Sequence, residues 1–213
     1  MFRYIDISIR SMLLSVAPIL VCLTLHELAH GYAAYRLGDD TAKLQGRLSL
    51  NPLKHLDPYG TIMLLLCGFG FAKPVPINMM RFRDPKRGMA ICAAAGPLMN
   101  ILITAVCLFA YGMLSARSPY GVMTELVYAT AVISAALAVF NLIPIPPLDG
   151  SRVLFSLLPE RIYYRLLPLD RYGSIILMIA VFLGILSPLL LAMRTFVLDM
   201  LWPLVDLGWT LMT

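Results

Sequence analysis

The chain has 213 residues, of which 60% are hydrophobic and 14% are charged, and its formal net charge is +5. Soluble domains contain about 45–50% apolar residues, so this composition excludes an ordinary soluble protein and predicts an α-helical polytopic membrane protein. The length allows about four spans of roughly 20 residues each. We therefore expect a single integral membrane domain over residues 1–213. Because the basic residues lie in short loops, we interpret them as topology determinants and expect no nucleic-acid partner.

The first predicted span covers about Ser11 to Tyr35. Arg3 and Arg10 precede this apolar run, as they would in a signal peptide, but no small-residue cleavage site follows, so we expect a retained span. It contains His26-Glu27-Leu28-Ala29-His30. On a helix, histidines at positions i and i+4 share a face and can bind one Zn²⁺, with Glu27 beside it as a candidate general base. Ionisable residues inside a membrane are costly, which favours a functional site over a structural role.

Three further runs have spanning length: Gly88–Leu114, Val122–Ile143 and Tyr172–Met193. The stretch Tyr59–Ala72 is too short to cross, so we expect a re-entrant half-helix there. The segment Thr195–Met212 carries two aspartates and two tryptophans at helical spacing, which predicts a C-terminal interfacial helix.

A second polar group follows the third span, in the segment Asn141-Leu142-Ile143-Pro144-Ile145-Pro146-Pro147-Leu148-Asp149-Gly150. Its prolines interrupt the helix, and irregular backbone at membrane depth is tolerated where it faces protein or a wet cavity. Catalytic zinc commonly has three protein ligands, so Asp149 is the candidate third ligand beside His26 and His30. The alternative is that Asp149 caps a following helix, about Ser151–Leu158; the two roles are compatible.

The two polar groups can meet only if an even number of crossings separates them. Two predicted spans, Gly88–Leu114 and Val122–Ile143, satisfy this condition if Tyr59–Ala72 does not cross. Thirteen of the 17 Lys and Arg residues then lie on the side of His26 and His30, which the positive-inside rule assigns to the cytoplasm.

Two segments have the pattern of strands. Residues Leu44–Asn51 alternate apolar and polar side chains, and Ala72–Asn78 has prolines two positions apart. We expect a small membrane-associated β hairpin, and two uses for it are open: one edge pairs with an unwound substrate by strand addition, or the hairpin only shields the cavity. Replacing Val75 with proline tests the first use.

The remaining candidate ligands have simpler interpretations. The four cysteines lie in apolar stretches without paired spacing and are read as buried hydrophobic residues, with a metal contact by Cys22 as a minor alternative. His55, the third histidine, is interpreted as a loop or interface residue, with a gate or an extra metal contact as the alternative.

Three motifs together resemble the site-2 protease family of intramembrane zinc metalloproteases: HELAH, the segment Asn141–Gly150, and Gly96-Pro97-Leu98-Met99-Asn100. The resemblance implies a catalytic core over about 11–158, accessory helices over 159–213, zinc bound by His26, His30 and Asp149, and Glu27 as catalytic base. It also suggests that Asn100 and Asn141 orient substrate or stabilise the oxyanion; the alternative is interhelical hydrogen bonding.

The resemblance further implies a minimal form without PDZ-like or CBS-like insertions, in a prokaryotic cell membrane. Its substrate would be a single-span membrane protein, such as an anti-sigma factor or another membrane-tethered regulator, in contact with the lipid bilayer. The alternative functions are a zinc-binding membrane transporter and a catalytically inactive scaffold. A transporter should show polar residues at mid-membrane on several spans or an internal repeat, and the sequence shows neither.

Overall fold

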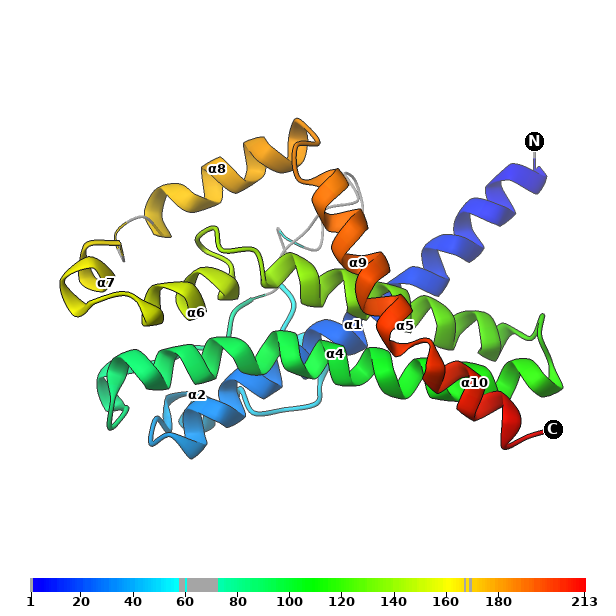
Figure 1. Cartoon of the computed structure of the whole chain (residues 1–213), viewed down its shortest axis with the longest axis horizontal. Helices are drawn as coiled ribbons and strands as arrows, with labels where there is room; N and C mark the ends of the chain where they lie inside the picture. Colours follow the sequence, from blue (N-terminus) through cyan, green and yellow to red (C-terminus); the bar gives the residue numbers. More distant parts are fainter. Residues whose placement is uncertain (1, 58–59, 61–72, 167, 169) are drawn as a thin grey trace. The chain divides into compact units, whose positions relative to one another are not determined.

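The computed structural model describes residues 2–57, 60, 73–166, 168 and 170–213. The described chain is helical (Figure 1). Its elements are α1 (Phe2–Arg36), α2 (Thr41–Leu44), the 3-10 turns η1 (Pro52–Lys54) and η2 (Met79–Arg81), α4 (Pro85–Arg117), α5 (Val122–Asn141), α6 (Asp149–Leu157), α7 (Glu160–Leu166), α8 (Asp170–Phe182), α9 (Ser187–Leu201) and α10 (Pro203–Thr210). The half-helix predicted over Tyr59–Ala72 lies outside the described residues, apart from residue 60.

Within the described chain, four helical segments are long and apolar enough to cross a membrane: Leu14–Arg36, Pro85–Arg117, Val122–Asn141 and Ser187–Thr210. On α4, Leu98, Leu102 and Val106 recur every four residues and are each more than half exposed. An exposed apolar stripe of this kind suits contact with lipid. The protein is therefore an integral multi-pass membrane protein.

The fourth span differs from the prediction. Tyr172–Met193 is not one helix, because α8 ends at Phe182 and a turn precedes α9. Gly184 in that turn has a φ of 68°, a left-handed conformation that glycine adopts without strain. The segment Thr195–Met212, predicted to be a separate interfacial helix, instead belongs largely to the apolar helical segment Ser187–Thr210. The length and hydropathy of this segment are those of a span in spite of its two aspartates.

The predicted β hairpin is wrong for the described residues, which contain no strand. Residues 41–44 form α2, and the chain then turns at Gly46, whose φ is +63°. Residues 73–78 form neither a helix nor a strand. Their backbone groups bond instead to the side chains of Glu27, Asp39 and Arg47 and to the His55 carbonyl. These partners satisfy the groups that a neighbouring strand would otherwise satisfy.

The described chain forms two compact units, and helices α1 and α4 each contribute one part to each unit. Unit 1 contains residues 1–22, 100–140 and 186–213. Its core includes Leu108, Ala131 and Val205, which are buried together. A Cβ added at Gly112 would lie 2.1 Å from the Val205 carbonyl oxygen, and one at Gly208 would lie 2.3 Å from that of Phe109. Small residues therefore let α4 and α10 approach closely, as is common between membrane helices.

Unit 2 contains residues 23–99 and 141–185. One part of its core is formed by Ala34 from α1, Phe82 from the segment before α4, and Cys92 from α4. Gly88 allows the Phe82 ring to pack against α4, since an added Cβ there would meet the ring at 2.6 Å. Unit 2 also contains the HELAH segment and Asp149, so the candidate site lies within one unit.

Candidate active site

Helix α1 positions the two histidines of the candidate site. His26 and His30 are one helical turn apart, and both are buried, with 4% and 6% of their surfaces exposed. The Nε2 atoms of their rings are 3.0 Å apart. Two imidazoles whose Nε2 atoms converge in this way can bind the same cation.

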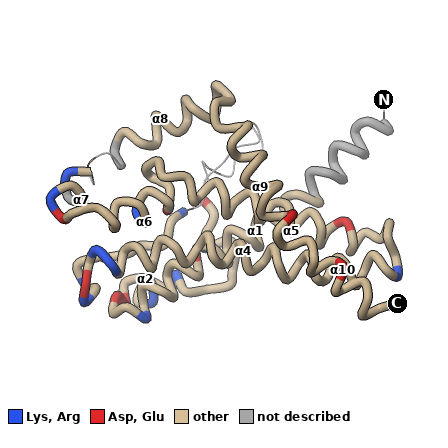
Figure 2. The backbone as a smooth tube through the Cα atoms, viewed as in Figure 1, with Lys and Arg blue, Asp and Glu red and all other residues tan. Residues whose placement is uncertain are grey.

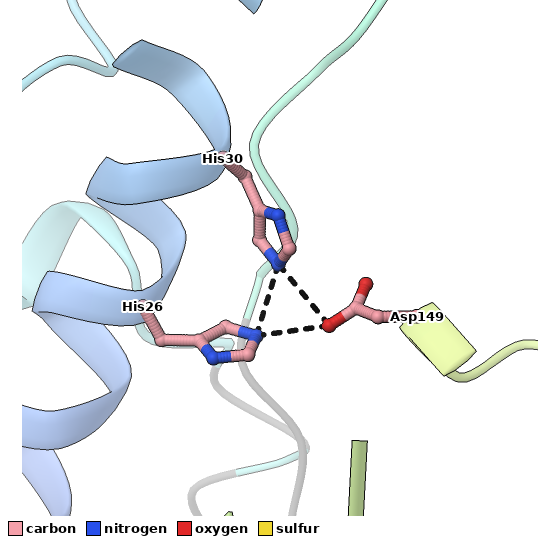
Figure 3. Close-up of side chains that lie close together, drawn as sticks. All are labelled: His26, His30 and Asp149. Atoms are coloured by element: carbon pink, nitrogen blue, oxygen red, sulfur yellow. Dashed lines mark hydrogen bonds and ion pairs between the residues drawn. The ribbon is translucent and has the colours of Figure 1, made fainter. Parts of the chain in front are cut away.

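Helix α6 supplies the third group. Asp149 is the first residue of α6, and the N-cap position is occupied by Leu148. Asp149 is therefore not the N-cap residue of α6, the alternative role suggested by the sequence. Gly150 lets the start of this helix lie against the end of the preceding loop, because an added Cβ would be 2.2 Å from the Leu142 carbonyl oxygen. The proline-rich loop and this glycine direct the Asp149 carboxylate toward α1 (Figure 3).

The three side chains converge on a small common space. The Asp149 Oδ2 atom lies 3.2 Å from His26 Nε2 and 3.3 Å from His30 Nε2. Zinc ligands at about 2.0–2.1 Å in tetrahedral geometry are separated from each other by about 3.3 Å. The observed separations of 3.0, 3.2 and 3.3 Å are close to the edges of such a tetrahedron. The donor set of two imidazoles and one carboxylate therefore fits Zn²⁺.

Helix α4 fixes the orientation of His30. Its Nδ1 atom lies 2.7 Å from the Cys92 carbonyl oxygen. A carbonyl can only accept a hydrogen bond, so Nδ1 carries a proton, and a neutral ring in this tautomer presents its lone pair at Nε2. The Cys92 thiol in turn donates to the His30 carbonyl at 3.2 Å.

Gly96 on α4 leaves room for both rings. A Cβ at this position would lie 2.4 Å from His30 Nε2 and 2.6 Å from His26 Cε1. No side chain fits there without displacing the imidazoles. The sequence pattern included Gly96 in a motif but gave it no role, and only the packing of α4 against α1 reveals one.

Glu27 contacts a different part of the unit. Its Oε2 atom accepts a hydrogen bond of 2.9 Å from the Val75 backbone N–H. The Lys73 N–H donates to the His55 carbonyl at 2.8 Å. The prolines at 74 and 76 leave the N–H groups of Lys73, Val75 and Ile77 as the donors expected to pair with a substrate strand. Those of Lys73 and Val75 are thus engaged within the chain. Strand addition at this edge would require Val75 to exchange Glu27 for a substrate carbonyl.

Two further charged residues hold the same segment, and no sequence motif marks either. The Arg47 Nη2 atom donates to the Lys73 and Pro74 carbonyls at 2.7 and 3.1 Å. The buried carboxylate of Asp39 accepts from the Asn78 N–H at 2.6 Å and from the Thr41 N–H at 3.0 Å. These bonds fix the position of residues 73–78, among which Val75 donates to Glu27.

The other two predicted site residues are asparagines. Asn100 is fully buried in unit 1, where its backbone carbonyl accepts 2.8 Å hydrogen bonds from Thr104 and Ser134. Asn141 is the last residue of α5 and belongs to unit 2. The side-chain roles suggested for both asparagines stay predictions.

The minor alternatives gain no support. Cys22 belongs to unit 1, where its thiol is 3.9 Å from the Thr130 carbonyl oxygen. His55 is buried, and its Nε2 atom lies 2.8 Å from the Ser49 carbonyl oxygen, which agrees with its interpretation as a loop residue.

Comparison with known proteins gives a consistent family. The family model of Peptidase family M50 matches residues 112–187. The chain is 38% identical to "Putative zinc metalloprotease YwhC" of Bacillus subtilis over 84% of this chain and 83% of that protein. It is 29% identical to "Putative zinc metalloprotease Rip2" of Mycolicibacterium smegmatis, over 78% of this chain and 66% of the relative.

A further relative, "Zinc metalloprotease MJ0392" of Methanocaldococcus jannaschii, is 28% identical over 68% of this chain and 34% of its own length. No solved structure matches the chain. The extent and identity of the match to YwhC show the family. The geometry of the two imidazoles and the carboxylate agrees with a zinc site in such a protein. The chain belongs to Peptidase family M50, the site-2 protease family, and is a zinc metalloprotease.

Proposed function

We propose that this zinc metalloprotease cleaves the membrane-spanning segment of a single-span protein, and that His26, His30 and Asp149 hold the zinc while Glu27 acts as general base. The observation that carries the proposal is the set of ligand-atom separations of 3.0–3.3 Å among two imidazoles and a carboxylate. The histidines lie on Leu14–Arg36, a helix long and apolar enough to span a membrane. A hydrolytic centre on such a helix suits a substrate that is itself in the membrane.

Bound by these ligands, Zn²⁺ would supply a Lewis acid for the scissile carbonyl and lower the pKa of water. Glu27 follows His26 directly on α1 and takes a proton from the attacking water, then returns it to the leaving amine. The Asn100 and Asn141 amides orient substrate or donate to the oxyanion. The Val75 N–H, which donates to Glu27, holds the base in one orientation between turnovers.

The proposed substrate is a membrane-tethered regulator, such as an anti-sigma factor, in a prokaryotic cell membrane. We propose that the site opens toward the cytoplasm. The basis is the positive-inside rule, and within unit 2 the Lys and Arg positions gather near α2, at the start of α4 and on α7 (Figure 2). The proposed domain organisation is a single protease domain over 1–213, with a core over about 11–158 and accessory helices over 159–213.

The test compares zinc content and cleavage of a labelled single-span substrate in liposomes for the wild-type protein and Glu27→Gln. We expect Glu27→Gln to retain one zinc ion per chain and to lose cleavage, because glutamine cannot accept the proton. Glu160→Gln is the matched control, since Glu160 is exposed at the start of α7. Equal cleavage by wild type and Glu27→Gln would reject Glu27 as the base.

The ligand assignment is tested separately. Asp149→Asn should lower zinc occupancy because a neutral amide is a much poorer ligand for zinc than a carboxylate. Asp206→Asn, at an exposed position of α10, should leave zinc occupancy unchanged. Full zinc occupancy in Asp149→Asn would remove Asp149 from the ligand set.

A further inference from the structure

A second polar site lies in the segment that connects α1 to α4, apart from the three candidate zinc ligands. It is a pocket of about 300 Å³ lined by Gln45, Gly46, Arg47, Leu53, Lys54, Leu56 and Lys73. Its volume is at the lower end of the range for small-molecule sites. Three of its lining residues are basic and none is acidic, so the pocket has the charge of an anion site.

None of the three cations pairs with an acidic side chain within the described residues. Arg47 donates to the carbonyl oxygens of Lys73 and Pro74, and Lys54 Nζ donates to the Gly46 carbonyl oxygen at 3.0 Å. Arg47 is 8% exposed, and its buried Nε atom has no hydrogen-bond partner among the residues that the structure describes. Carbonyl oxygens orient these side chains but do not neutralise them. A buried donor without a partner and an uncompensated positive charge both favour binding of an anion.

The surroundings of the pocket indicate where the anion comes from. Leu53 lines the pocket and is 74% exposed, and Leu44 and Leu50 in the same connection are 73% and 68% exposed. The connection begins after Arg36, the end of one candidate span, and ends before Pro85, the start of the next. Exposed leucines beside basic side chains at the end of a span are typical of the boundary between acyl chains and headgroups.

We infer that the pocket formed by Arg47, Lys54 and Lys73 binds the phosphate group of an anionic phospholipid, while the exposed leucines contact its acyl chains. The shared chemistry is recognition of a phosphate by Lys and Arg. The leucines select the lipid over free phosphate, because a soluble anion would gain nothing from them. This site is independent of the proposed zinc chemistry, and its test does not require cleavage.

The test uses the full chain in phosphatidylcholine nanodiscs and measures binding of a fluorescent phosphatidylglycerol. The principal variant is Lys54→Gln with Lys73→Gln, both exposed positions where folding should be unaffected. We expect its affinity to fall about 30-fold, from the contribution of two basic residues near a lipid headgroup. Arg47→Gln should weaken binding further, but it also releases the carbonyls of residues 73 and 74.

The matched control is Arg83→Gln with Arg87→Gln, which removes the same charge from exposed positions outside the pocket. Its affinity should stay within about twofold of the wild-type value. An equal loss in this control would show a general charge effect and overturn the site. Absence of saturable phosphatidylglycerol binding by the wild-type protein would also overturn it.

A second arm separates lipid from soluble phosphate. Inorganic phosphate and glycerol 3-phosphate are titrated as competitors of the bound fluorescent lipid. We expect neither to displace it at concentrations where unlabelled phosphatidylglycerol does. Displacement by inorganic phosphate at concentrations similar to those of the unlabelled lipid would assign the pocket to free phosphate and reject the lipid.

Discussion

The two compact units differ in what fills their interiors. In unit 1, Leu108, Ala131 and Val205 pack together, and Gly112 and Gly208 let helix backbones approach closely. In unit 2, the interior also contains His26 and His30, beside the partly buried Asp149, together with the buried residues Asp39 and Arg47. Both units bury polar groups, but among the described residues those of unit 1 are hydroxyls and the Asn100 amide, whereas unit 2 buries imidazole, carboxylate and guanidinium groups.

This difference predicts different consequences for similar substitutions. A buried polar group costs free energy when it loses its partner, so changes in unit 2 should disturb the site before they unfold the chain. Changes in unit 1 should act through packing and leave zinc binding intact. One glycine-to-alanine substitution in each unit can therefore test whether the two units respond differently.

The largest effect is expected for Gly96→Ala. The added Cβ would lie 2.4 Å from His30 Nε2 and 2.5 Å from His30 Cε1, so it must displace the imidazole. We expect zinc affinity to fall about 10- to 100-fold, as for other changes that disturb ligand orientation, and cleavage to fall with it. Zinc titration by competition with a chelator measures the first quantity. Wild-type zinc affinity in Gly96→Ala would contradict the packing of α4 against these rings.

Val75→Pro should have the next largest effect. Proline removes the N–H that donates to Glu27, so the carboxylate loses a partner while the three candidate zinc ligands stay unchanged. We expect at least about tenfold slower cleavage with normal zinc content.

Val75→Ala is the control for this prediction because it keeps the N–H and shortens only the side chain. It should cleave substrate at close to the wild-type rate. If alanine and proline reduce cleavage equally, the side chain of Val75 matters and the backbone donor does not.

Gly112→Ala should act on unit 1 alone. The added Cβ would lie 2.1 Å from the Val205 carbonyl oxygen, which cannot move as a side chain can. We expect a loss of about 1–3 kcal/mol in the free energy of unfolding. Denaturation in detergent, with zinc content measured on the folded fraction, checks both parts of the prediction. Loss of zinc from the folded fraction would show that the units are not separable in this way.

The smallest effect concerns Asp39. Burial raises the pKa of Asp39. Hydrogen bonds from the Thr41 hydroxyl, the Asn78 N–H and the Thr41 N–H together lower the pKa by more than burial raises it, so it lies below the ordinary value of 3.8. A carboxyl group of this kind stabilises the fold above its unfolded pKa, and the stabilisation is lost as the pH falls through the folded pKa. Between pH 7 and pH 5 we expect no change from this group.

Below about pH 4, the protection of the Asn78 amide, relative to its intrinsic exchange rate at the same pH, should therefore fall in the wild-type protein. In Asp39→Asn the amide of Asn78 should already exchange faster at neutral pH, because a bond to a charged acceptor worth roughly 1.5–3 kcal/mol is weakened. Protection of Asn78 that is equal in both proteins at every pH would contradict this role of Asp39.

The sequence alone predicted the features that depend on local pattern. Hydropathy and length predicted three of the four candidate spans, because a membrane helix satisfies its own backbone and must be apolar over about 20 residues. The sequence also predicted which side chains converge. Helical periodicity puts His26 and His30 on one face of a helix, and an even number of crossings returns the chain to the same side of the membrane at Asp149. The Nε2 atoms of His26 and His30 and the Oδ2 atom of Asp149 lie within 3.3 Å of one another.

Only the tertiary structure decided the features that depend on partners distant in sequence. The alternation of Leu44–Asn51 suggested a strand, but α2 and a turn form there, and residues 73–78 bond to side chains instead of to a strand. The boundary of the fourth span depended on the turn at Gly184, which hydropathy does not detect. The roles of Gly96, Arg47 and Asp39 follow from contacts across 26 to 70 positions of sequence, and no local pattern encodes a neighbour at that separation.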